Sequence, residues 1–128
     1  FKVTGAVELD NPPAVIDNIV PELTATPTFE WHRASSYSST AEYYIEVVDE
    51  SGTTIWGGFD IDGNPQATPI PGGNTMTVKY NEDSLASVPT LESGRYYQLR
   101  VYASDDNWPA SYTLLSATET LDGVFKVE

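Results

Sequence analysis

Residues 91–103 read Leu91-Glu92-Ser93-Gly94-Arg95-Tyr96-Tyr97-Gln98-Leu99-Arg100-Val101-Tyr102-Ala103 and hold the clearest alternation of apolar and polar side chains in the chain. Successive side chains of a β-strand point to opposite faces, so this spacing predicts a strand over Arg95 to Ser104 with one face in a core. The inward side chains are expected to be Tyr97, Leu99, Val101 and Ala103, and the outward ones Gln98, Arg100 and Tyr102.

The same spacing of two recurs on both sides of this segment. It predicts strands in Val3–Leu9, Pro27–Arg33, Glu42–Asp49, Thr53–Phe59, Thr75–Asn81 and Val124–Glu128. The turn signal Glu50-Ser51-Gly52 predicts that the two strands beside it form a hairpin. Residues 60–74 contain three prolines and three glycines, which predicts a long surface loop. Val124–Glu128 is expected to be a final edge strand with Phe125 and Val127 facing inward.

The expected core combines apolar side chains from five of these strands. They are Phe29, Trp31, Tyr43, Ile45, Val47, Met76, Val78 and Tyr80, together with the inward side chains of the strand over Arg95–Ser104 and of the final strand. About seven strands with no helical spacing between them predict an all-β fold, a two-sheet antiparallel β-sandwich. We expect residues 26–128 to form this sandwich. Residues 1–25 would be an N-terminal strand and irregular lead-in that packs on the sandwich or pairs with a neighbour.

The composition excludes several classes of protein. The chain has 128 residues, 40% of them hydrophobic, which suits one folded domain with one core. It lacks cysteine, so thiol catalysis, zinc–thiolate sites and disulfides are excluded. The 19 acidic and 6 basic residues give a net charge of -13, which disfavours nucleic acid and anionic membrane surfaces as partners. No stretch approaches the ~20 apolar residues of a membrane span, so membrane insertion is not expected.

The segment over residues 91–103 resembles the strand F pattern of the fibronectin type III family, in which Leu, Tyr, an aliphatic residue, Val and Ala recur at even offsets. Trp31 matches the family's strand B tryptophan, and Tyr43-Tyr44-Ile45-Glu46-Val47 resembles its strand C. The resemblance covers about residues 26–128 and implies a fibronectin type III-like or immunoglobulin-like sandwich. It also implies that Tyr97 packs its ring inside while its hydroxyl bonds to backbone a few residues upstream.

The resemblance indicates where such a chain works. Similar modules occur as spacers, adhesion domains and accessory domains of bacterial secreted and surface proteins. We therefore expect an extracellular or cell-surface location. Fold alone does not assign a function, which depends on the chemistry of particular residues.

Catalysis has little support in the sequence. His32 is the only histidine, and the alternation places it on the outward face of a strand, without a nucleophile motif to accompany it. Acidic pairs such as Asp49 and Glu50 are expected to be solvated in a chain this acidic. We predict that the chain is not an enzyme and needs no cofactor other than, in one hypothesis, calcium.

The calcium hypothesis rests on Asp60, Asp62 and Asn64, whose side-chain oxygens fall at alternate positions as they do in calcium-binding loops. The complete EF-hand pattern fails, because it needs glycine at Pro65 and glutamate at Pro71. The same residues are also ordinary turn formers. A looser calcium site remains a hypothesis.

A carbohydrate hypothesis rests on exposed aromatic rings, which can stack on sugars. Trp108 lies in a polar loop and is the best candidate, with Tyr112 and Tyr102 as further platforms. An alternative is that Trp108 anchors its loop on the edge of the sandwich. Trp56 is expected to cap the core instead.

Three functions follow from these features. The first is a non-catalytic structural or protein-interaction module of an exported bacterial surface or secreted protein, whose partners are another protein or neighbouring modules of the same assembly. The alternatives are a carbohydrate-binding accessory domain that uses exposed aromatic side chains, and a calcium-stabilised adhesion module. Protein contacts would use sheet edges, with Val3–Leu9 and Phe125–Glu128 expected to be free.

Overall fold

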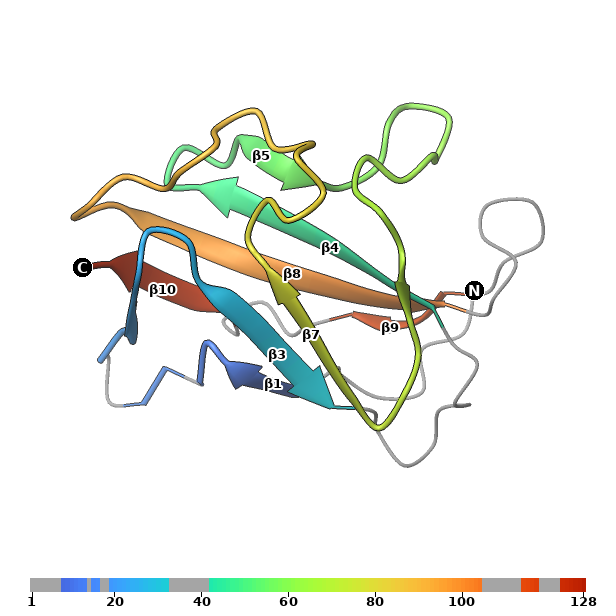
Figure 1. Ribbon diagram of the computed structural model, residues 1–128, viewed down its shortest axis with the longest axis horizontal. Helices are drawn as coiled ribbons and strands as arrows, with labels where there is room; N and C mark the ends of the chain where they lie inside the picture. The colour runs from blue at the N-terminus through green and yellow to red at the C-terminus, as the bar shows by residue number, and fades with distance from the viewer. Residues whose placement is uncertain (1–7, 14, 17–18, 33–41, 105–113, 118–122) are drawn as a thin grey trace.

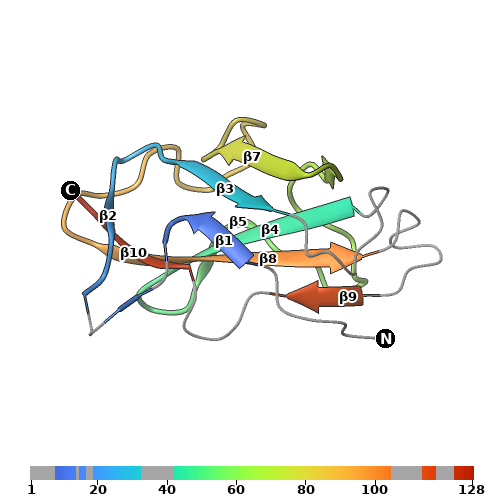
Figure 2. The same cartoon turned by 90° about the horizontal axis from the view of Figure 1, so that it is seen from below.

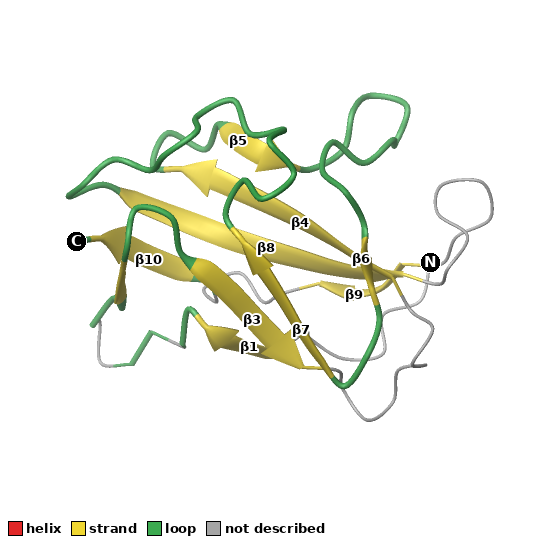
Figure 3. Ribbon diagram, viewed as in Figure 1, coloured by secondary structure: helices red, strands yellow, loops and turns green. Residues whose placement is uncertain are grey.

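A computed structural model of the chain describes residues 8–13, 15–16, 19–32, 42–104, 114–117 and 123–128 (Figure 1). These residues form strands and loops and contain no helix (Figure 3), hence none that could cross a membrane. The strands belong to two sheets, which is consistent with the expected β-sandwich.

The smaller sheet has three antiparallel strands in the order β1-β3-β7. Their bounds are Glu8–Asn11 for β1, Thr28–His32 for β3 and Thr75–Lys79 for β7. Strand β1 therefore belongs to this chain's own sheet. The expected strand over Val3–Leu9 falls mostly on residues 1–7, outside the described residues.

The larger sheet has seven strands. They are β2 (Glu22–Leu23), β4 (Glu42–Asp49), β5 (Thr54–Gly57), β6 (Ile70–Pro71), β8 (Tyr96–Ser104), β9 (Leu114–Ala117) and β10 (Val124–Val127). The main path runs β2-β10-β8-β4-β5, and β6 pairs with β4 while β9 pairs with β8. All pairs are antiparallel except β2 with β10. Figure 2 shows β3 and β7 in one layer and β4 and β8 in the other.

The core lies between the two sheets, as the alternation predicts. Every inward side chain expected from the sequence is buried, with exposed fractions from 0% to 6%. Phe29 of β3 packs against Phe125 of β10 with ring centroids 5.7 Å apart, and Trp31 packs against Tyr43 at 5.9 Å. Aromatic pairs of this kind add roughly 0.5–1.5 kcal/mol to the free energy gained by burying apolar area. These contacts join the smaller sheet to the larger one.

Tyr97, in the segment over residues 91–103, makes the hydrogen bond to upstream backbone that the resemblance implies. The Tyr97 hydroxyl accepts a hydrogen bond from the backbone N–H of Glu92 at 3.0 Å, and its ring stacks on Phe125 at 5.9 Å. The polar tip is therefore satisfied while the ring stays in the core.

The strands differ from the sequence-based expectations in three respects. Strand β10 is not a free edge, because it pairs with β8 on one side and with the two-residue β2 on the other. Residues 60–74 are not entirely loop, because Ile70–Pro71 pairs with the start of β4. We expected about seven strands and the described residues form ten, since short segments such as β2 and β6 add to the larger sheet.

The outward face of β4 also differs from a simple alternation. Tyr44 and Val48 point away from the core and are nevertheless only 2% and 4% exposed. Phe59 explains the burial of Tyr44, since its ring centroid lies 5.7 Å from Tyr44 and 5.5 Å from Tyr102. An aromatic cluster thus covers this part of the larger sheet.

Candidate functional site

The outer edge of β7 is open along part of its length. Tyr80 donates its N–H to the Pro27 carbonyl at 2.8 Å, which fixes the phase of the antiparallel ladder with β3. Because hydrogen-bonded pairs alternate along such a ladder, Met76 and Val78 direct their backbone groups at β3. The backbone N–H and C=O groups of Thr75 and Thr77 point the other way.

One end of this edge is closed by a side chain. The Lys79 N–H donates to Glu82 Oε1 at 2.7 Å, and the Glu82 N–H donates to the Lys79 carbonyl at 3.0 Å. Among the described residues, no group pairs with the outward backbone groups of Thr77. The open segment of the edge is therefore Thr75–Thr77, and both threonines are exposed.

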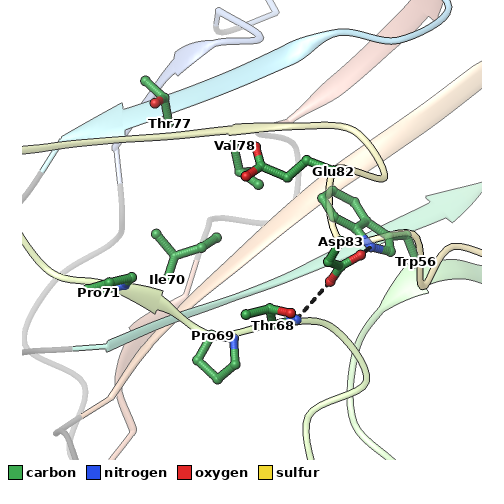
Figure 4. Close-up of a pocket in the computed structure, with 9 residues that line it drawn as sticks. All are labelled: Trp56, Thr68, Pro69, Ile70, Pro71, Thr77, Val78, Glu82 and Asp83. Atoms are coloured by element: carbon green, nitrogen blue, oxygen red, sulfur yellow. Dashed lines mark hydrogen bonds between the residues drawn. The ribbon is translucent and has the colours of Figure 1, made fainter.

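A groove of about 330 Å³ runs beside this open segment (Figure 4). One wall is β7 and the other is the segment Thr68–Pro71, and Ile70 and Val78 extend toward each other from the two walls. Trp56 forms the far end with Glu82 and Asp83. The groove is thus apolar in its middle and acidic at one end.

Asp83 holds this end of the groove together. Its carboxylate accepts hydrogen bonds from Trp56 Nε1 at 2.9 Å, the Thr68 N–H at 2.9 Å and the Leu85 N–H at 3.0 Å. Burial alone would raise the pKa of Asp83, but these donors outweigh it and lower the pKa below the ordinary 3.8. Trp56 is 2% exposed and packs edge-on against Tyr80 at 5.3 Å, so it caps the core as expected.

The edge of β5, unlike that of β7, is covered by a loop. Ser87 donates both its N–H, at 2.8 Å, and its hydroxyl, at 3.1 Å, to the carbonyl of Ile55. Proteins commonly cover a sheet edge in this way, because unpaired strand edges attract other strands. The loop that covers β5 leaves the Thr75–Thr77 segment of β7 open.

Asp60, Asp62 and Asn64 lie in one tight loop. Asp60 Oδ1 accepts the N–H groups of Asn64 at 2.8 Å and Asp62 at 2.9 Å, and these hydrogen bonds close the loop. The backbone hydrogen bond from Asn64 is the main reason that the pKa of Asp60 is lowered. Within the described ranges, no three His, Asp or Glu side chains group as a metal site would need. The calcium hypothesis remains a prediction.

The structure describes one of the three proposed sugar-binding rings. Tyr102 is partly buried beside Phe59, and its hydroxyl donates to Glu46 Oε1 at 3.0 Å. Burial raises the pKa of Tyr102 to about 12, and the Glu46 carboxylate adds to the effect. Trp108 and Tyr112 lie outside the described residues, so the carbohydrate hypothesis that names them remains a prediction.

His32 occupies the outward position expected for it. Its Nδ1 lies 3.0 Å from the Asp10 carboxylate on the neighbouring strand β1, and both side chains are 40% exposed. Pairs this exposed typically contribute 0–1 kcal/mol to stability.

Sequence reasoning missed the open edge of β7 and the anchoring role of Asp83. The alternation in Thr75–Lys79 identifies the strand but not its neighbours, and Asp83 is 27 residues from the indole that it contacts. The polar turn after β7, which contains Glu82 and Asp83, was the one sequence signal that pointed to this region.

The chain was also compared with known proteins. No family model, curated protein or solved structure matches it significantly. Its function must therefore be argued from the geometry.

Proposed function

We propose that the chain is a non-catalytic structural or protein-interaction module of an exported bacterial surface or secreted protein. The observation that carries the proposal is the open segment of β7 beside an apolar groove. An unpaired strand edge offers backbone hydrogen bonds to another chain, and adjacent pockets can select its side chains.

We also propose that the fold is of the fibronectin type III kind. Support comes from the division into a β1-β3-β7 sheet and a facing sheet that contains β5-β4-β8-β10 in that order. The hydrogen bond between Tyr97 and the Glu92 N–H supports it further, because a tyrosine of this kind is a hallmark of such sandwiches. The buried Trp31 on the central strand of the smaller sheet agrees with this assignment.

The exported location rests on the resemblance and on charge. The net charge of -13 keeps the chain soluble and repels acidic surfaces. Protease treatment of intact producing cells tests the location: an exported module is digested, whereas a protein of the cell interior is protected until lysis.

Site-specific photo-cross-linking in the producing cell tests the interaction role. A photoreactive amino acid is placed at Thr77, on the open edge, and in a control at Thr90, an exposed loop position on which the proposal places no partner. The proposal predicts ultraviolet-dependent adducts with a protein or a neighbouring module from Thr77 and few from Thr90. Absence of adducts from Thr77 would count against an interaction through this edge.

Carbohydrate binding is the second candidate, and one observation favours it. A shallow groove of about 240 Å³ on the larger sheet is lined by Tyr96, Gln98 and Arg100, and Tyr96 is 41% exposed. An exposed ring beside amide and guanidinium donors suits a sugar. A glycan array probed with the wild type and with Tyr96→Ala decides: a blank array rejects the idea, and binding lost in the variant supports it.

A further inference from the structure

We infer that the open segment of β7 binds an extended peptide by strand addition, and that this peptide carries apolar side chains at alternate positions and a basic residue. The inference rests on the proposed interaction function and names the chemistry of the partner. Three features of the structure support it: the free backbone groups, the shape of the groove and its charge.

The backbone groups define where the added strand pairs. Thr77 and Thr75 each offer one N–H and one C=O to a new strand. The strand cannot continue past Lys79, because Glu82 already bonds to the backbone there. The structure therefore favours a short segment rather than a long β-ribbon.

The groove defines which side chains the added strand should carry. Alternate residues of an added strand point to one face, and on the groove side they meet Ile70, Val78 and Trp56. The volume of about 330 Å³ is near the lower end of the ~300–1,000 Å³ typical of ligand pockets. It suits one or two apolar side chains and is too small for a folded element.

The charge of the groove defines which charged residues the peptide should carry. The charged residues that line the groove, within the described part of the chain, are Glu82 and Asp83. Both carboxylates accept N–H donors from the protein, and for Asp83 these donors lower the pKa and stabilise the ionised form. With a net charge of -13 on the whole chain, a basic peptide is attracted and an acidic one repelled.

A second copy of the chain fits this edge poorly. Two copies would each bring a net charge of -13, and in each copy the backbone of Lys79 is closed by Glu82. Edge-to-edge pairing of two β7 strands would thus join two acidic proteins over a very short segment. The occupant is accordingly assigned as a basic peptide of another chain.

The test uses the full chain and a defined probe. A fluorescent peptide Lys-Val-Thr-Val-Lys with blocked ends is titrated with the protein, and fluorescence anisotropy is measured. Two comparison peptides replace both Lys with Glu or carry N-methyl groups on every backbone nitrogen. We expect both to bind at least tenfold more weakly, because one loses the charge attraction and the other loses the donors needed for pairing.

Variants of the protein locate the binding. Thr77→Pro removes the outward N–H without breaking a bond to β3, whereas Thr77→Val keeps that N–H and is the matched control. We expect at least tenfold weaker binding for the first and less than a twofold change for the second. Glu82→Gln keeps an oxygen to accept the Lys79 N–H and should weaken binding about two- to fivefold, as expected for one exposed charge pair.

The outcomes separate the possibilities. No binding by the wild type, or equal binding by folded Thr77→Pro, overturns the inference. If Thr77→Pro does not fold, the N-methylated peptide and Glu82→Gln decide, and unchanged binding in both overturns it. A concentration-dependent doubling of mass without peptide would identify a second copy as the occupant. If the peptide fails while Thr77 still cross-links to protein in cells, the proposed function stands and only the partner's chemistry is wrong.

Discussion

Replacing Asp83 by alanine removes the acceptor of three hydrogen bonds at the end of the groove. Trp56 is 2% exposed, so its Nε1–H would lack a partner, at a cost of about 1–3 kcal/mol. Thr68 and Leu85 are exposed, so water can replace the carboxylate and each lost bond should cost only about 0.5 kcal/mol. The free energy of unfolding should fall by about 2–4 kcal/mol in total.

Urea unfolding followed by far-ultraviolet circular dichroism measures this loss. The midpoint should fall without a change in the denaturant slope, and the melting temperature should drop by about 10 °C. Asp83→Asn is the matched control, because its amide oxygen can still accept from Trp56, and it should lose about 1 kcal/mol. An alanine variant within about 0.5 kcal/mol of the wild type would refute the anchoring role.

The same contact has a pH dependence. The folded-state pKa of Asp83 is lowered below 3.8, so its contribution to stability is present above that pH and is lost as the pH falls through the folded-state pKa. The stability difference between the wild type and Asp83→Ala should therefore shrink below about pH 3.8. A difference that stayed constant down to pH 2 would mean that the charge is irrelevant.

Three further predictions concern the framework. Tyr97→Phe removes an acceptor of a backbone N–H and should lower the free energy of unfolding by about 1 kcal/mol in urea; an unchanged midpoint would contradict the contact. Gly123→Ala should cost far more stability than Gly52→Ala, because the added Cβ at Gly123 would lie 2.1 Å from a carbonyl oxygen of β8. Gly52 is the matched control, since it has a similar positive φ but no atom within 4 Å of an added Cβ. Equal losses of melting temperature in the two variants would exclude the clash. Burial raises the pKa of Tyr80 and of Tyr102 from 10.0 to about 12, so their contribution to stability is present below pH 10 and is lost as the pH rises through 12. A tyrosinate absorbance titration should lose part of its late-ionising signal when either tyrosine is replaced by phenylalanine, and a late signal unchanged in both variants would contradict this.

The strands of the core were predictable because local spacing decides them. In Tyr96–Ser104 and Thr75–Lys79, every second side chain is apolar and buried, so periodicity alone identifies the inward face. The same rule missed the burial of Tyr44, because Phe59 covers it from a distant part of the chain. Local spacing says nothing about such coverage.

The alternation of apolar and polar residues does not predict the order of the strands in the sheets. The sequence marks Val124–Val127 as a strand, but its parallel pairing with Glu22–Leu23 depends on how the lead-in folds back. For the same reason the expected free edge was misplaced. The open segment at Thr75–Thr77 emerges only once β3 is known to be the one described strand that pairs with β7 and Glu82 is seen to close its end.

The candidate sites were harder to predict because the same residue types serve turns and ligands. Asp60 and Asn64 have the spacing of a calcium loop, yet in the structure they bond to each other and to the loop backbone. Asp83 had no such motif and proved to be the residue that organises the groove. Its role depends on Trp56, which the fold brings to it.

Amide hydrogen exchange of β7, followed by nuclear magnetic resonance, tests the open edge most directly. The amides of Met76 and Val78 should exchange slowly, because they are bonded to β3, and that of Thr77 should exchange many times faster. Adding the basic peptide should slow Thr77 and leave Val78 unchanged. Equal protection of Thr77 and Val78 in the free protein would contradict the account, because this edge would then already have a partner.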